Sequence, residues 1–162
     1  MLRALTLLAC VALSACQINL APSYDKAVVD GLGKASEESL TLLAEAAGGT
    51  SASTFPSRAK AYNQLIGRLE ALALAAGARP MPKNKATDAI NRALEKRGAQ
   101  PLEDDEATPP SAHAIAKVAE TFAKMRDTDR KQGVTAFEVE AFKGQVRIYL
   151  DQAITYENFL QR

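Results

Sequence analysis

The segment Thr135–Leu160, TAFEVEAFKGQVRIYLDQAITYENFL, decides the fold class of this chain. Its apolar and aromatic residues return at alternating intervals of three and four, which places them on one face of an α-helix. The members of this face are Val139, Phe142, Val146, Tyr149, Ala153, Tyr156 and Leu160. Thr135 and Glu138 predict a capping box at the start, with Val134 and Val139 as its hydrophobic staple. The pattern predicts a long amphipathic helix.

Upstream of this segment the chain alternates between helical periodicity and breaks rich in glycine and proline. Helices are predicted over Tyr24–Ala47, Ser57–Ala76, Thr87–Arg97 (the short one) and Ser111–Asp127. No segment predicts a strand. Because the connections between consecutive helices are short, antiparallel neighbours are favoured. The sequence therefore predicts an all-α fold, an antiparallel helical bundle of four main helices plus one short helix, in a single domain over residues 24–162.

Gly31 and Gly33 stand inside the first predicted helix. Each glycine costs a helix interior about 1 kcal/mol relative to alanine, so it needs a reason to be there. One reason is a break in the helix. The other, which we favour, is close packing against a neighbouring helix.

The composition is that of a globular protein without a charge bias. The chain has 162 residues, of which 47% are hydrophobic and 24% charged. Twenty Lys and Arg residues face 19 Asp and Glu residues. A balanced charge gives no electrostatic basis for binding nucleic acid, where neutralisation of phosphates dominates affinity. Nucleic acid is therefore not expected as a partner.

The first sixteen residues have the order typical of a signal peptide. Arg3 supplies a positive charge, and the ten residues Ala4–Leu13 are apolar and uncharged. The small residues Ser14 and Ala15 follow, as a signal peptidase requires. The apolar run is well short of the ~18 residues that a membrane-spanning helix needs. The leader is therefore expected to direct export and then to be removed.

The four residues Leu13-Ser14-Ala15-Cys16 resemble the lipobox of bacterial lipoproteins. The resemblance implies cleavage before Cys16, a diacylglyceryl thioether on its sulfur and an acyl group on its amine. Residues 1–15 would be the signal peptide, and residues 16–23 a tether to the bundle. An ordinary secretory signal with a chance cysteine is the alternative.

The residue after the cysteine bears on location. Gln17 stands where an Asp usually marks inner-membrane retention in enterobacterial lipoproteins, so the resemblance implies the outer membrane and a domain facing the periplasm. The final segment, Ala141–Arg162, is similar to an uncharacterised family of bacterial lipoproteins, which implies no activity. If Cys10 leaves with the leader and Cys16 carries lipid, the mature domain has neither a disulfide nor a free thiol.

Four side chains stand at the spacing of an EF-hand calcium loop: Asp127, Asp129, Thr135 and Glu138. Lys131 takes the fifth place, where a ligand oxygen is required, and Gln132 takes the sixth, where the turn requires glycine. An interhelical turn at Gly133 followed by the capping box explains the same residues. No metal site is predicted, and Asp127, Asp129 and Glu138 remain the candidate ligands if an ion does bind.

No catalytic set is apparent in the sequence. His113 is the only histidine, and no cysteine or serine is spaced to form a nucleophile–base pair with it. No pair of histidines exists to hold zinc. We expect His113 to be a surface or half-buried residue. Neither an enzyme nor a cofactor is predicted.

Aromatic residues near the end of the last predicted helix permit a ligand pocket. Tyr149, Tyr156, Phe142 and Phe159 could line it, although packing in the core explains them more simply. Glu157 lies close to the same face. If buried, its carboxyl would mark a site; the rim of the bundle is the expected place.

These observations favour a membrane-anchored envelope lipoprotein whose periplasmic bundle acts as a binding or scaffolding module. Its expected contacts are membrane lipid through acylated Cys16 and another envelope protein. A carrier of a small ligand or of calcium is the second hypothesis. An enzyme, which would need carboxylates such as Glu157 to be gathered by folding, ranks last.

Overall fold

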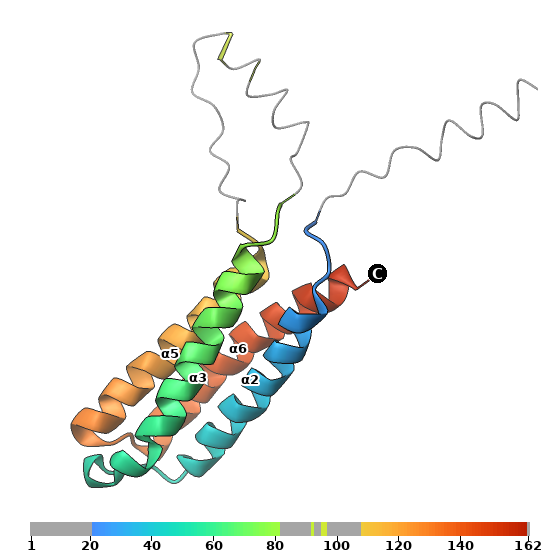
Figure 1. Cartoon of the computed structure of the whole chain (residues 1–162). Helices are drawn as coiled ribbons and strands as arrows, with labels where there is room; N and C mark the ends of the chain where they lie inside the picture. Colours follow the sequence, from blue (N-terminus) through green and yellow to red (C-terminus); the bar gives the residue numbers. More distant parts are fainter. Residues whose placement is uncertain (1–20, 82–91, 93–94, 97–107, 162) are drawn as a thin grey trace, which may run out of the picture. The chain divides into compact units, whose positions relative to one another are not determined.

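The computed structural model describes residues 21–81, 92, 95–96 and 108–161. Within these residues four α-helices lie side by side, with consecutive helices running in opposite directions (Figure 1). The helices are α2 (Lys26–Glu45), α3 (Pro56–Gly77), α5 (Pro110–Gln132) and α6 (Ala136–Leu160), with a short 3₁₀ turn, η1 (Ala52–Thr54), before α3. The prediction of an all-α antiparallel bundle is confirmed.

These four helices belong to one compact unit. The predicted leader and most of the tether over 16–23 lie outside the described residues. So does nearly all of the predicted short helix Thr87–Arg97, although Arg92 and Glu95 are helical. The description below concerns the four-helix unit.

Each helix of the unit packs against two neighbours, in the cyclic order α2, α3, α5, α6 and back to α2. The predicted apolar face of α6 points inward. Val139, Val146 and Ala153 have no exposed surface, and Phe142 and Tyr149 pack against the core from its edge. Burial of such a face is the main source of stability for an amphipathic helix. The spacing that predicted this helix therefore reflects which of its residues pack against the core.

The junction between α5 and α6 corrects one boundary. Helix α5 was predicted to end at Asp127 but continues to Gln132. Asp129 on that extra turn is fully buried and hydrogen-bonded, so the turn is held by contacts that helical periodicity does not reveal. Gly133 ends the helix with φ 83° and ψ 169°, a backbone conformation that only glycine adopts readily. The interhelical connection is thus three residues long.

The start of α6 agrees with its prediction. The Glu138 N–H donates to Oγ1 of Thr135, and the Thr135 N–H donates to Oε2 of Glu138, at 3.2 and 2.8 Å. This is the reciprocal capping box, which satisfies two backbone donors that a helix start leaves unpaired. Val134 and Val139 are both buried beside it.

The two glycines of α2 have different surroundings. The helix runs unbroken through both. A Cβ placed on Gly31 would lie 2.5 Å from Cδ2 of Leu72 on α3, whereas one on Gly33 would meet no atom within 4 Å. Gly31 therefore permits the close approach of α2 and α3, which confirms close packing and not a break at that position.

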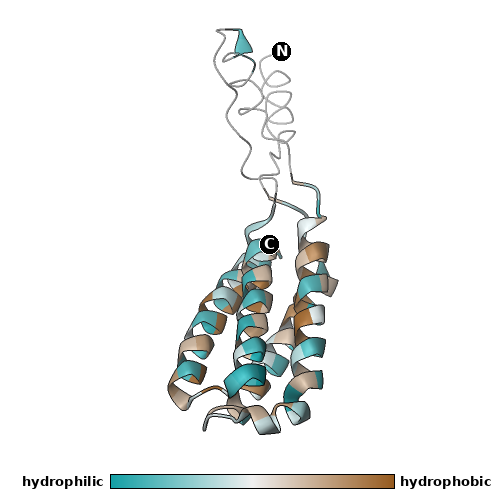
Figure 2. Cartoon of the chain, turned by 90° about the vertical axis from the view of Figure 1, so that its left-hand side faces the viewer, coloured by the Kyte–Doolittle hydropathy of each residue, from teal (hydrophilic) through white to brown (hydrophobic). Residues whose placement is uncertain are grey.

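Polar and apolar residues are interspersed along every helix of the unit (Figure 2). Among the helices that the structure describes, none has the length and hydrophobicity needed to cross a membrane.

Candidate functional site

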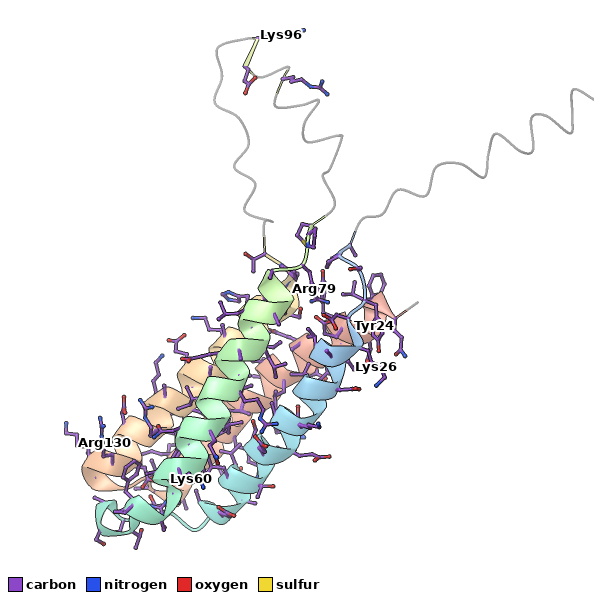
Figure 3. All side chains as sticks on the ribbon, in the orientation of Figure 1. Tyr24, Lys26, Lys60, Arg79, Lys96 and Arg130 are labelled. Carbon is purple, nitrogen blue, oxygen red and sulfur yellow. The ribbon has the colours of Figure 1, made fainter. Side chains whose placement is uncertain are left out.

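Two buried ion pairs lie at opposite ends of the bundle, and both use an arginine at an end of α3. Arg79 follows the last turn of α3, while Lys60, near the start of the same helix, and Arg130 mark the other end (Figure 3). Buried ionisable groups are the first places to look for chemistry in a structure of unknown function.

The first pair joins Arg79 to Glu157 in the last turn of α6. Nη1 and Nη2 of Arg79 donate to the two carboxylate oxygens of Glu157 at 2.8 and 2.5 Å. Nη2 also donates to Oγ of Ser111, and Nε donates to the Ala76 carbonyl. The side chains of Arg79 and Glu157 are only 6% and 1% exposed. Arg79 thereby connects the C-terminal ends of α3 and α6 with the first turn of α5.

The second pair joins Arg58 to Asp129 in the last turns of α5. Nε and Nη2 of Arg58 donate to the two oxygens of Asp129, each at 2.9 Å. Oγ1 of Thr50 donates to Asp129 at 2.5 Å and accepts the N–H of Val134 at 2.9 Å. The Thr50 N–H donates to the Val134 carbonyl. These bonds connect the loop before α3 with the loop before α6.

The electrostatics of this second pair are dominated by burial and by its hydrogen bonds. Burial acts to raise the pKa of the Asp129 carboxyl, but the hydrogen bonds from Arg58 and Thr50 outweigh it and hold that pKa below its usual range. The same bond raises the pKa of the Arg58 guanidinium. Burial, with a contribution from the Asp129 charge, raises the pKa of the Tyr62 hydroxyl far above its ordinary value. All three groups keep their ordinary charge state at neutral pH.

The Tyr62 hydroxyl is the exception in an otherwise well-bonded end. Its oxygen is buried and has no hydrogen-bond partner among the residues that the structure describes. Its ring stacks on Phe55 with centroids 6.3 Å apart. The ring contributes to the core, while no hydrogen bond in the described residues offsets the burial of the hydroxyl, which lies within the influence of the Asp129 charge.

Glu157 corrects one expectation, because it was expected at the rim and is instead buried. Its carboxylate meets a guanidinium and not a second carboxylate, so it lacks the partner that shared-proton or two-carboxylate chemistry requires. Both oxygens are already occupied by Arg79. This arrangement suits a structural ion pair, not an acid–base catalyst.

The three candidate calcium ligands are not brought together. Asp127 is exposed on α5 and pairs with Arg126 and Arg130. Asp129 is held by Arg58, and Glu138 caps α6. Asp127 and Asp129 are helical and not part of a loop, because α5 extends past them. Within the described ranges, no group of three or more His, Cys, Asp or Glu side chains could hold a metal ion.

An open groove of about 1240 Å³ lies between α3 and α5. Most of the residues that line it are small: Ala73, Gly77, Ala78, Ala112, Ala116, Ala119 and Ala123. Leu74, which is 75% exposed, projects at its side. His113 lies there too and is exposed, as predicted. The groove is lined mainly by apolar residues, and Glu70 and Glu120 are the acidic residues of its lining.

The aromatic residues of α6 do not gather around one pocket. Phe142 and Tyr149 pack against the core, as the simpler interpretation predicted. Tyr156 is half-buried, and burial raises the pKa of its hydroxyl. Phe159 is 55% exposed. These residues contribute separately to packing and to the surface.

Arg58, Arg79, Thr50 and Ser111 were not predicted as members of a site. Their carboxylate partners lie 71 to 79 residues away in the chain for the two arginines and Thr50, so no local spacing connects them. An arginine just after the predicted end of a helix was the one available signal for Arg79.

Cys16 lies outside the described residues. Comparisons with protein-family models, with curated proteins and with solved structures give no match for this chain.

Proposed function

We propose that this protein is a lipid-anchored binding or scaffolding module of the bacterial cell envelope. The observation that carries the proposal is the leader, in which a ten-residue apolar run closes on Leu13-Ser14-Ala15-Cys16. Cleavage before Cys16 and acylation of its sulfur and amine would attach the bundle to a membrane, with residues 16–23 as the tether. One acyl chain holds a protein only marginally, but two or more hold it stably.

The distribution of charged groups supports a role in binding instead of catalysis. Asp129 and Glu157, the two buried carboxylates among the described residues, have their oxygens occupied by arginines. The pKa of Asp129 lies below its usual range, which is the opposite of the shift that would make this carboxyl a general acid or base at neutral pH. Exposed apolar residues such as Leu74 and Phe137 provide surface that another envelope protein could cover.

The anchor is tested by metabolic labelling with a palmitate analogue in the native or a related bacterium. The Cys16→Ser variant should lose the label and move from the membrane fraction to the soluble periplasm. The matched control is Cys10→Ser, which changes the other cysteine of the leader and should keep both label and location. Equal labelling of parent and Cys16→Ser would overturn the lipid anchor.

The binding role is tested separately by affinity capture of the full-length protein from detergent-solubilised membranes. Quantitative mass spectrometry should identify an envelope protein enriched with the parent over an unrelated lipoprotein of similar abundance. Enrichment that persists in Cys16→Ser would place the binding surface on the bundle itself. Absence of any specifically enriched protein would contradict the scaffolding role.

A further inference from the structure

Helix α2 is held in the bundle differently from the other three helices. Its buried apolar residues are Val28, Leu32, Ala35, Leu42 and Leu43. Ser39, its one buried polar residue, donates to a carbonyl of its own helix at 2.6 Å. Glu38 pairs with Arg68 of α3 at 3.1 Å, but both side chains are 42% exposed, and an ion pair so exposed contributes little to stability. The charge of Glu45 acts weakly on Arg58. Apolar packing is therefore what holds α2.

The other three helices are also joined to one another by the two buried ion pairs. Arg79, at the end of α3, binds Glu157 of α6 and Ser111 of α5, and Arg58 of α3 binds Asp129 of α5. In the part of the chain that the structure describes, no residue of α2 shares a hydrogen bond with these five side chains. Separation of α3, α5 or α6 would break a buried ion pair, which is costly. Separation of α2 would leave both pairs intact.

The connection that follows α2 is fixed to the rest of the bundle only a few residues beyond the helix. The Thr50 N–H donates to the Val134 carbonyl at 2.7 Å, and Oγ1 of Thr50 is bonded to Asp129 and to the Val134 N–H. Gly48 and Gly49 lie between this point and the helix, so the backbone can turn there with little steric hindrance. Because α2 is the first helix of the described unit, it can separate by movement about this one connection.

Helix α2 is not expected to stay helical once it separates. Most of the stability of a helix in a protein comes from packing of its apolar face. Gly31 and Gly33 lie inside α2, and each weakens it relative to alanine. Separation and unfolding should therefore occur together. Such an opening is visible as exchange of the amide hydrogens of α2 with solvent.

We propose that α2 opens as a unit while α3, α5 and α6 stay together, joined by the two buried ion pairs. Opening would uncover apolar surface on the two helices that α2 packs against, including Leu72, which faces Gly31. If the proposed lipid anchor is present, a pull between membrane and bundle acts first on α2, because the tether precedes this helix. The opening itself does not depend on lipid at Cys16, so failure of either proposal would leave the other standing.

Hydrogen exchange followed by mass spectrometry compares the four helices directly. It is measured on the full-length protein in detergent under native conditions. The slowest amides of α2 should exchange about tenfold or more faster than the slowest amides of α3, α5 and α6, because they need only the partial opening. Equal protection of the four helices would contradict the proposal.

Two matched glycine variants distinguish a separate opening from a joint one. Gly33 of α2 and Gly67 of α3 are both exposed inside a helix, and a Cβ on either would meet no atom within 4 Å. Alanine at either position should stabilise its helix and slow exchange by about fivefold. Gly33→Ala should slow exchange in all four helices, because α2 is unfolded in the partial opening and in the complete one.

Gly67→Ala should slow exchange in α3, α5 and α6 and leave α2 unchanged, because α3 remains folded when α2 opens. Circular dichroism would check that both variants keep the helical content of the parent. Slower exchange of α2 in Gly67→Ala, by the same factor as in the other helices, would show that the four helices open together and would overturn the proposal.

Discussion

The two ends of the bundle use the same chemistry in different settings. At each end an arginine at one end of α3 meets a carboxylate in the last turns of another helix. Arg79 and Glu157 are both almost fully buried, and their bonds connect helix ends. Arg58 keeps 13% of its side chain exposed, and its network connects two loops through Thr50. The Arg79–Glu157 pair is thus shut off from water, whereas Arg58 of the second pair is partly in contact with it.

This difference matters because a buried ion pair is not strongly stabilising in itself. The attraction between the charges is largely offset by the free-energy cost of removing them from water. Removal of one partner is costly, however, because the other charge remains buried without compensation. The expected cost therefore depends on whether the remaining group can reach solvent, which the exposures of Arg79 and Arg58 predict to differ.

The largest effect is expected from Glu157→Ala. It leaves the Arg79 guanidinium buried without its carboxylate and should lower the free energy of unfolding by about 3–5 kcal/mol. Urea unfolding followed by circular dichroism measures this. The double variant Arg79→Met with Glu157→Leu should lose much less, because no unpaired charge remains. Equal losses in the single and double variants would contradict the account of this end.

Asp129→Ala should cost less, about 2–3 kcal/mol, because the remaining Arg58 can turn toward water while Thr50 loses an acceptor. The same urea experiment compares the two ends directly. A cost at Asp129 that equals or exceeds the cost at Glu157 would mean that exposure of the arginine does not set the penalty.

Gly133→Ala probes the loops that the second pair connects. The backbone of Gly133 has φ 83° and ψ 169°, which costs other residues of order 1–3 kcal/mol. A Cβ there would also collide with the backbone of Thr50. We expect a loss of about 2 kcal/mol in urea unfolding. The control is Gly48→Ala, which would meet no atom within 4 Å and has no positive φ, and it should be nearly neutral.

The stability that the Arg58–Asp129 pair contributes should also depend on pH in the acid range. The pKa of Asp129 is lower in the folded protein than its ordinary value. Its contribution to stability is therefore full above the unfolded pKa of about 3.9 and is lost as the pH falls through the folded pKa. Part of the fall in stability below about pH 4 should be absent in Asp129→Asn. Parallel pH curves for parent and variant would contradict this.

The smallest expected effect is a slight gain in the free energy of unfolding. Tyr62→Phe removes a buried hydroxyl that lacks a hydrogen-bond partner among the described residues and leaves the ring in place. Because the hydroxyl is buried without compensation, stability should be unchanged or rise by up to about 1 kcal/mol. A clear loss of stability in thermal unfolding would show that the hydroxyl is bonded after all, with Asp129, whose charge raises its pKa, as the candidate partner.

The helices and the capping box of α6 could be predicted because their signals are local. Apolar residues three and four apart share a face, and Thr135 and Glu138 lie within one turn. The ion pairs could not be predicted, because Arg79 and Glu157 are 78 residues apart in the chain. The end of α5 was misplaced for the same reason. Its last turn is held by Arg58 and Thr50, which folding brings to Asp129 from the other half of the chain.

Asp129 also shows why a spacing that resembles a site need not form one. As part of an EF-hand pattern it was a candidate calcium ligand, together with Asp127 and Glu138. In the fold the three carboxylates serve an internal ion pair, a surface pair and a helix cap. Spacing in a sequence does not show whether the intervening residues form a loop or continue a helix.

The central functional claim is that a lipid on Cys16 anchors the bundle. The most direct measurement is mass spectrometry of the N-terminal peptide from the mature protein isolated from its own membranes. The account predicts a peptide that begins at Cys16 and carries the mass of a diacylglyceryl group. A peptide that begins elsewhere, or an unmodified Cys16, would contradict it.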